Sequence, residues 1–129
     1  MIVDTSAIIA ILQVESDAIW FAERLAAAPN PRMSAATYVE LVTVCDRRIG
    51  TAAVGKAERL LQRSNIDFVP FTVEQARWAR HARLTYGVGR HPANLNLGDC
   101  FAYALAKETG EPLLFKGNDF AHTDVIAAA

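Results

Sequence analysis

The stretch MIVDTSAIIAIL, residues 1–12, contains the pattern that decides the fold class. Its first three residues form a short apolar run, which is typical of a buried β-strand. The next three, Asp4, Thr5 and Ser6, are residue types that cap the amino terminus of an α-helix. The apolar residues that follow recur at helical spacing. We therefore expect a buried strand that leads directly into a helix, with one of the three polar residues as its N-cap.

Short apolar segments and longer segments of helical periodicity alternate along the rest of the chain. Proline, glycine and capping residues mark the borders between them. Helices are expected at residues 17–28, 36–49, 51–64, 72–86 and 96–109, and strands at 33–35, 66–69, 113–115 and 125–126. Two of these helices begin with a capping-box pattern, which pairs Thr72 with Gln75 and Asn96 with Asp99.

This alternation predicts an α/β fold. Strands separated by helices of about ten or more residues are typical of a parallel sheet that helices cover on both faces. The length of 129 residues suits one core, and the sequence contains no repeat, low-complexity segment or linker. We therefore expect a single domain over residues 1–129.

The composition excludes several classes of protein. A hydrophobic fraction of 52% and a charged fraction of 21% argue against a disordered tail. The net charge of −1 provides no overall attraction to nucleic acid, so such binding requires a local patch or bound cations. The start of the chain has no basic leader, and no run reaches about 18 apolar residues, which predicts a cytoplasmic protein without a membrane partner. Cys45 and Cys100 lack C-x-x-C spacing, and we expect both to be reduced core residues.

Four carboxylates are placed where the loops of such a sheet converge. In an open parallel sheet, functional groups gather at the carboxyl ends of the strands. Asp4 ends the first strand, and Glu40 lies in the helix after the second. Asp99 begins the helix that precedes the fourth strand, and Asp119 follows that strand. All four side chains could therefore face one cleft.

Each carboxylate also has an interpretation that involves no function. Asp4 suits an N-cap, Asp99 complements a helix dipole, and Asp119 is a common turn residue. Glu40 fits this interpretation less well, because it lies among apolar residues, where an unpaired carboxylate is costly unless it reaches the helix edge or a cation.

Four carboxylates in one cleft require cations. Two of them at roughly 4 Å repel each other by several kcal/mol at an effective dielectric constant near 20. Oxygen ligands select hard divalent ions, which here means Mg²⁺ or Mn²⁺ and excludes a Cys/His zinc site. The three histidines show no i,i+4 pairing, and we do not interpret them as ligands.

A basic segment follows in the second half of the chain. Residues 75–98 contain no acidic residue and hold Arg77, Arg80, Arg83 and Arg90. One interpretation is a solvated helix face, and the other is a phosphate clamp beside the acidic cleft. Lys116 leaves the same choice open, between a phosphate contact and plain surface.

Four ordered blocks of this sequence resemble the PIN-domain family, and specifically its VapC-like toxins. The blocks are IVDTSA at residues 2–7, ATYVE at 36–40, LNLGDCFAYALA at 95–106 and LLFKGNDF at 113–120. The opening block is a weak signal alone, whereas the ordered set of four spans nearly the whole chain and is specific. The four acidic positions all match.

The resemblance implies a fold, an activity and partners. The expected fold is a Rossmann-like three-layer α/β/α sandwich in which Asp4, Glu40, Asp99 and Asp119 hold one or two Mg²⁺ or Mn²⁺ ions. The expected activity is that of an endoribonuclease on structured cellular RNA, with Ser6 ordering a metal-bound water. The expected assembly is a homodimer that a small VapB-like antitoxin neutralises.

Two other functions are compatible with part of this sequence. A haloacid-dehalogenase-like phosphohydrolase also begins with an aspartate after its first strand, but it normally needs a second aspartate two residues later, where this chain has Ser6. A binding module that keeps the fold without turnover is the other rival, and the presence of all four acids counts against it.

Overall fold

The computed structural model describes residues 1–129 and contains one parallel sheet of four short strands. The strands are β1 (Ile2–Val3), β2 (Arg32–Ser34), β3 (Asp67–Val69) and β4 (Leu113–Leu114), in the spatial order β3-β2-β1-β4. Ile2 of the central strand β1 pairs with Arg32 on one side and with Leu113 on the other. All pairings are parallel, as the alternation of strands and helices predicts.

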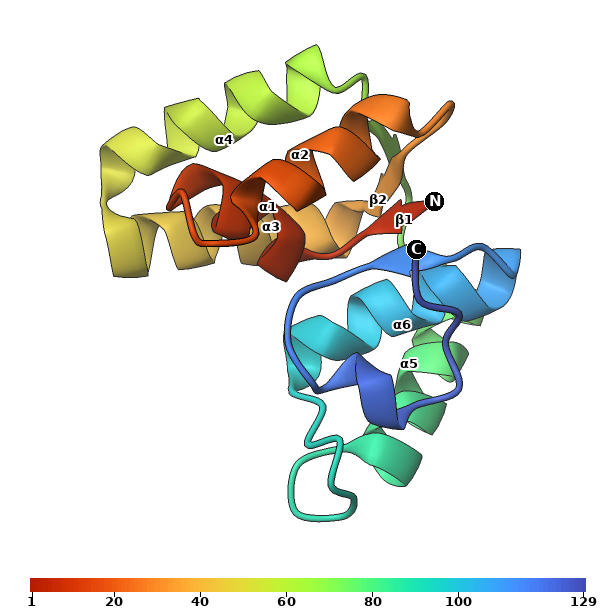
Figure 1. Cartoon of the computed structure of the whole chain (residues 1–129). Coiled ribbons are helices and arrows are strands. Elements are labelled where there is room, and N and C mark those ends of the chain that lie inside the picture. The colour runs from red at the N-terminus through yellow and green to blue at the C-terminus, as the bar shows by residue number, and fades with distance from the viewer.

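Helices cover both faces of this sheet. They are α1 (Thr5–Leu12), α2 (Ala18–Ala27), α3 (Ala35–Val44), α4 (Thr51–Arg63), α5 (Val73–Tyr86) and α6 (Leu97–Thr109), with a π-helical turn η1 (Cys45–Ile49) and a 3₁₀ turn η2 (Phe120–His122). Figure 1 shows α1–α4 stacked on one side of the strands and α5 and α6 on the other. The expected three-layer α/β/α sandwich is confirmed.

The alternation of side chains along the strands divides the core between the two layers. Successive residues of a strand face opposite sides of the sheet. Val3 and Leu114 accordingly pack with residues of α1–α4, whereas Ile2 and Leu113 pack with residues of α6. Cys45 and Cys100 are free and buried, one in each half of the core, as expected for reduced core residues.

Helix caps follow the sequence signals closely, with one exception. Asp4 is the N-cap of α1, and Asn96 and Asp99 form a complete reciprocal capping box at α6. Thr72 caps α5 by accepting the N–H of Gln75 at 3.1 Å, but the predicted box is incomplete. The Gln75 side chain is buried, and its Nε2 donates to the carbonyl of Pro70, whereas its Oε1, which would have to accept the N–H of Thr72 to complete the box, has no partner.

Two other predicted boundaries are wrong. Ala35 was expected to end a strand, but it is the first residue of α3, since Ser34 accepts the N–H of Ala36 as its N-cap. Residues 125–126 do not form a strand. The chain end makes only a single parallel bridge, between Ala127 and Leu113, because β4 offers two residues for pairing. None of the helices has the length and apolar character that crossing a bilayer requires.

Candidate functional site

The four predicted acidic residues lie in one hollow at the carboxyl ends of the strands. The hollow has a volume of about 360 Å³. It is lined by Asp4, Thr5, Ser6, Ile9, Gln13, Glu15, Glu40, Val44, Arg48, Asn96, Asp99, Lys116 and Asp119. Four separate segments of the chain supply the acids, so the sheet topology is what brings them together.

Asp4 lies at the floor of this acidic hollow, directly after β1. Its side chain is 3% exposed. Its Oδ2 accepts the N–H of Ser6 at 3.0 Å and the Ser6 hydroxyl at 2.6 Å, whereas its Oδ1 is buried without any hydrogen-bond partner. Burial raises the pKa of this carboxyl. A buried, unpartnered carboxylate oxygen is costly unless a cation meets it.

Ser6 connects two elements at the edge of the hollow. Its hydroxyl donates to Asp4 and accepts the backbone N–H of Lys116 at 2.9 Å. This pair of hydrogen bonds ties the loop after β4 to the beginning of α1. Ser6 therefore orients the Asp4 carboxylate.

Glu40 reaches the hollow from α3, and its carboxylate is fixed by two neighbours. Thr5 donates its hydroxyl to Glu40 Oε1 at 2.5 Å. Glu40 Oε2 lies over the backbone of Gly98 in the first turn of α6, in space that a β-carbon at Gly98 would need. Burial is the main cause that raises the pKa of Glu40, and the negative charge of Asp4 raises it further. Although Glu40 has apolar neighbours in the sequence, its carboxylate lies in the acidic hollow, because the side chain extends to the end of the sheet.

Asp99 combines the structural and the functional interpretation. Its Oδ2 accepts the N–H of Asn96 at 3.0 Å, so it does serve as a capping residue. The same side chain lines the acidic hollow. Burial raises the pKa of Asp99 to about 7, and the negative charges of Asp4, Asp119 and Glu40 act in the same direction, against the backbone hydrogen bond from Asn96. In the absence of a cation, this carboxyl therefore keeps its proton to a much higher pH than an ordinary aspartate does.

Asp119 lies at the mouth of the hollow, exposed and without a side-chain hydrogen bond, where the loop after β4 turns into η2. Its carboxylate oxygens are therefore accessible to a ligand. The sequence placed it in a turn, and the structure confirms that position.

The donor set fits a hard divalent cation that keeps part of its water shell. No three Asp, Glu, His or Cys side chains converge closely enough here to form a complete coordination sphere. Mg²⁺ in particular is usually held by only one or two carboxylates, with water and substrate phosphate supplying the other ligands. Asp4 Oδ1 is the buried oxygen that most requires such an ion. The charges of Asp4 and Asp119 both act on the neighbouring Asp99.

Lys116 stands at the rim of the hollow, but its charge is already paired. Its Nζ lies 2.6 Å from Glu15 and 2.9 Å from Asp17. These two acids raise the pKa of Lys116. The sequence left two roles open for Lys116, a phosphate contact or plain surface, and did not predict these ion pairs. They attach the loop after β4 to the segment between α1 and α2.

The arginines of the basic segment lie elsewhere. Arg77, Arg80 and Arg83 are exposed on α5, Arg90 is exposed in the loop before α6, and none of them lines the acidic hollow. Their contact with RNA stays a prediction. The reason for the separation is the topology, because α5 packs against the far side of α6.

Sequence reasoning missed several polar residues of the hollow. Gln13 and Glu15 lie just beyond the end of α1, and Arg48 lies in η1. A π-helical turn has no clear signal in a single sequence, so the placement of Arg48 was not available from periodicity.

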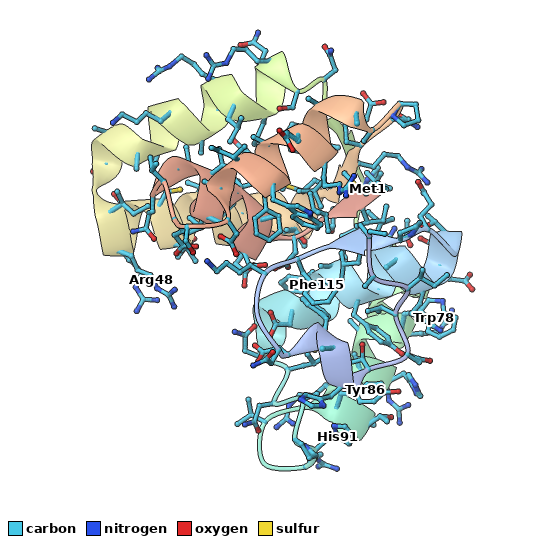
Figure 2. The ribbon with its side chains drawn as sticks, in the orientation of Figure 1. Met1, Arg48, Trp78, Tyr86, His91 and Phe115 are labelled. Carbon is cyan, nitrogen blue, oxygen red and sulfur yellow. The ribbon has the colours of Figure 1, made fainter.

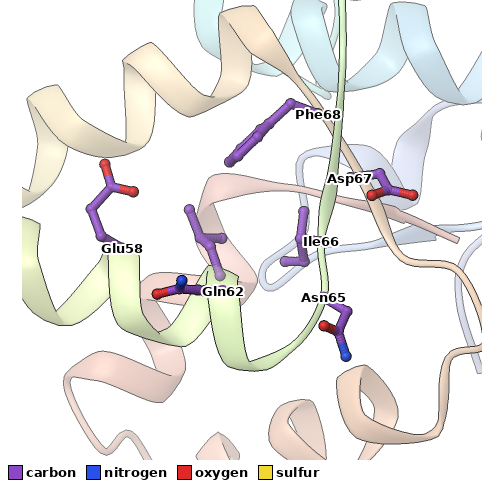
Figure 3. A pocket seen from close by; sticks show the side chains of 7 residues that line it. Glu58, Gln62, Asn65, Ile66, Asp67 and Phe68 are labelled. Atoms are coloured by element: carbon purple, nitrogen blue, oxygen red, sulfur yellow. The ribbon is translucent and has the colours of Figure 1, made fainter.

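A second and larger hollow, of about 520 Å³, lies between α4 and the edge strand β3. Figure 3 shows Glu58 and Gln62 of α4 on one side of it, with Asp67 and Phe68 of β3 on the other. Glu58 accepts a hydrogen bond from Tyr38. This hollow gathers no cluster of titratable groups and is a weaker candidate than the acidic one.

Comparison with known proteins points to one family. Residues 1–126 match the family model of the PIN domain. Ribonuclease VapC42 of Mycobacterium tuberculosis is 51% identical over 129 residues, which are 99% of this chain and 98% of that protein.

Two solved structures share the fold. The crystal structure of Mycobacterium tuberculosis VapC20, described as a sarcin-ricin loop cleaving toxin, matches with a TM-score of 0.79 at 17% identity, covering 98% of this chain and 97% of that one. A toxin–antitoxin complex from Klebsiella pneumoniae matches with a TM-score of 0.71 at 18% identity, covering 98% and 95%. At these identities the two structures bear on the fold alone.

Proposed function

The chain belongs to the PIN-domain family, and on that premise we propose that it is a metal-dependent endoribonuclease that acts as the toxin of a toxin–antitoxin pair. The relative at 51% identity over nearly the full length of both chains is named a ribonuclease, which supports the activity. The observation that carries the metal dependence is Asp4 Oδ1, a buried carboxylate oxygen without a donor in a hollow lined by other acids.

Asp4, Glu40, Asp99 and Asp119 would hold the cation or cations, which we take to be Mg²⁺ or Mn²⁺. A bound ion of this kind supplies a water of lowered pKa and neutralises charge that develops on the phosphate. Ser6 and Thr5 keep two of the carboxylates in place through the hydrogen bonds described above. The least engaged oxygens, Asp4 Oδ1 and those of Asp119, are free to face the ion.

One of these four carboxylates would also accept the proton of the attacking water. Asp99, with a pKa of about 7, and Glu40, whose pKa is also raised, are the two candidates for this role. Water is the nucleophile in this scheme, and the 2′-hydroxyl of the RNA is not. Cleavage therefore leaves a 5′-phosphate and a 3′-hydroxyl.

We propose the RNA substrate to be a structured cellular RNA such as tRNA, rRNA or mRNA, and the setting to be the cytoplasm. The partner would be a small VapB-like antitoxin, and the active form a homodimer. The resemblance of the four sequence blocks to VapC-like toxins, together with a relative at 51% identity that is named VapC42, supports the antitoxin. The proposed contacts to the RNA are Arg77, Arg80, Arg83, Arg90 and Lys116. Lys116 can make such a contact only if its ion pairs with Glu15 and Asp17 open.

The test is cleavage of purified RNA with Mg²⁺ or Mn²⁺, with excess EDTA, and after the metal is restored. Cleavage should occur only with the metal and should return with it, because the carboxylates alone do not activate water. An Asp4→Asn variant purified in the same way controls for contaminating nuclease and should be inactive. Undiminished cleavage in EDTA by the wild type, but not by this variant, would overturn the metal mechanism.

A further inference from the structure

Arg48 is the one cation of the acidic hollow that no carboxylate pairs. The lining includes five acids, Asp4, Glu15, Glu40, Asp99 and Asp119, and two cations, Lys116 and Arg48. Lys116 is engaged by Glu15 and Asp17. Arg48 forms no ion pair within 4.0 Å, and its side chain is exposed. Its guanidinium is therefore available to a ligand.

The π-helical turn η1 explains why Arg48 reaches the hollow at all. Arg48 is eight residues after Glu40 on the continuous helix formed by α3 and η1. In a regular α-helix this spacing would turn the two side chains roughly 80° apart. A π turn contains an extra residue and so rotates the chain less per residue, which returns Arg48 toward the face of Glu40. Both residues accordingly line the same hollow.

Figure 2 shows Arg48 projecting from the end of this helix, clear of the ribbon. Its neighbour Arg47 is equally exposed on the same turn but does not line the hollow. The two arginines thus share their local backbone and their charge and differ in what they face. This difference makes Arg47 a matched control.

An RNA phosphate that enters the hollow meets an excess of negative charge. Divalent cations held by the carboxylates would offset part of this repulsion. A guanidinium at the rim can bind a further phosphate through two parallel hydrogen bonds, a geometry that lysine cannot provide. Arg48 lines the hollow from the turn that follows α3, so its guanidinium can reach a phosphate bound on that side.

We propose that Arg48 binds a backbone phosphate of the substrate beside the scissile one and so sets the register of the RNA in the acidic hollow. This inference rests on the proposed ribonuclease function and adds a substrate contact to it. Arg48 positions RNA and takes no part in the bond-breaking step.

The alternative role for Arg48 is electrostatic support of Glu40. Burial raises the pKa of Glu40, and the positive charge of Arg48 partly opposes that rise. The two roles make different predictions for RNA binding. Loss of a cation that only supports Glu40 would leave the RNA affinity and its salt slope equal to those of Arg47→Ala, whereas loss of a phosphate contact would lower both.

The experiment compares Arg48→Ala, Arg48→Lys and Arg47→Ala. Binding of a labelled RNA stem–loop is measured on an Asp4→Asn background that does not cleave, across a range of salt concentrations. Arg48→Ala should weaken binding by about tenfold, as for loss of one charged hydrogen-bonding group. It should also lower the slope of log K against log salt by about one unit. Arg48→Lys should fall between wild type and Arg48→Ala, and Arg47→Ala should bind within about twofold of the background protein.

Cleavage kinetics on the wild-type background provide the second readout. Arg48→Ala should raise KM with little change in kcat, because uniform binding is lost and the bond-breaking step is untouched. The melting temperature should match that of Arg47→Ala. Equal RNA affinity and salt slope in the two alanine variants would overturn this inference alone. Wild-type protein that neither binds nor cleaves RNA would overturn the proposed function and the inference with it.

Discussion

The carboxylate of Glu40 occupies the space in which a β-carbon on Gly98 would have to stand. The two residues come from different helices, α3 and α6, and meet at the acidic hollow. Gly98 has ordinary helical geometry, so its backbone conformation does not demand glycine. The close approach of Glu40 does.

Gly98→Ala should therefore displace Glu40 and impair metal binding and cleavage. In an unhindered helix this change would add up to about 1 kcal/mol of stability through helix propensity. Here we expect no gain in the free energy of unfolding, a weaker affinity for Mn²⁺ and a loss of kcat of about tenfold or more. Gly55→Ala in α4, where only the far end of Arg59 is near, is the matched control. Full activity of Gly98→Ala would show that Glu40 needs no fixed position.

The like charges of the hollow should make the metal-free protein less stable than its neutral variants. Asp4→Asn and Asp99→Asn each remove one repelling charge and keep a side chain that can cap a helix. We expect each variant to be inactive and to have an unchanged or higher melting temperature in EDTA. Glu23→Gln, on the exposed surface of α2, is the control. A large loss of metal-free stability would instead support a purely capping role for these aspartates.

The raised pKa of Asp99 predicts a direction for the pH dependence of stability. The folded protein holds the proton up to about pH 7, whereas the unfolded chain releases it near 3.8. Between these values the folded state binds more protons, so the free energy of unfolding of the metal-free protein falls as pH rises. The slope should stay below the roughly 1.4 kcal/mol per pH unit of one full proton, because Asp99 is partly exposed.

Urea unfolding curves in EDTA, recorded at intervals of about half a pH unit between pH 5 and 8, measure this slope. Asp99→Asn should show a shallower dependence than the wild type. Since a metal ion requires the ionised carboxylate, the affinity for Mg²⁺ should rise over the same range and its binding should release protons. Parallel curves for the two proteins would contradict the assignment of the shift to Asp99.

The arginines on α5 allow a separate test of the path of the RNA. If Arg77, Arg80 and Arg83 contact phosphates, each alanine variant should weaken RNA binding and lower the salt slope by about one unit. Arg63→Ala at the end of α4 is a control of equal charge on another exposed helix. If the salt slopes equal the slope of the control, the α5 arginines belong to a solvated helix face. Their absence from the lining of the acidic hollow is compatible with that result.

The antitoxin should inhibit through the same carboxylates. We expect it to place an apolar helix over the surface formed by α1, α2 and α3, where Val14 and Ile19 are 81% and 75% exposed. We also expect it to extend an arginine to the acidic hollow, where a guanidinium can pair with Asp99 or Asp119 in place of metal. Titration of Mn²⁺ into free and antitoxin-bound protein tests this, and the complex should bind less metal. Equal affinity would show that inhibition acts by blocking RNA access.

Local features of this protein follow from its sequence alone. The order of the first four strands and the helices between them, an N-cap among Asp4, Thr5 and Ser6, and the capping box of Asn96 and Asp99 agree with the sequence prediction. They are predictable because a cap or an apolar run depends on residues that are within a few positions of one another. The convergence of the four acids was also predictable, since parallel strands bring their carboxyl ends to one edge of the sheet.

Other features were decided only by tertiary structure. Lys116 is paired with Glu15 and Asp17, and Arg48 reaches the acidic hollow through a π turn. The α5 arginines lie away from that hollow, and Gly98 makes room for Glu40. Each of these depends on which side chain of one element meets which side chain of another. Periodicity specifies the face of a helix that is buried, but the partner on that face is chosen by packing across the whole core, which no local pattern encodes.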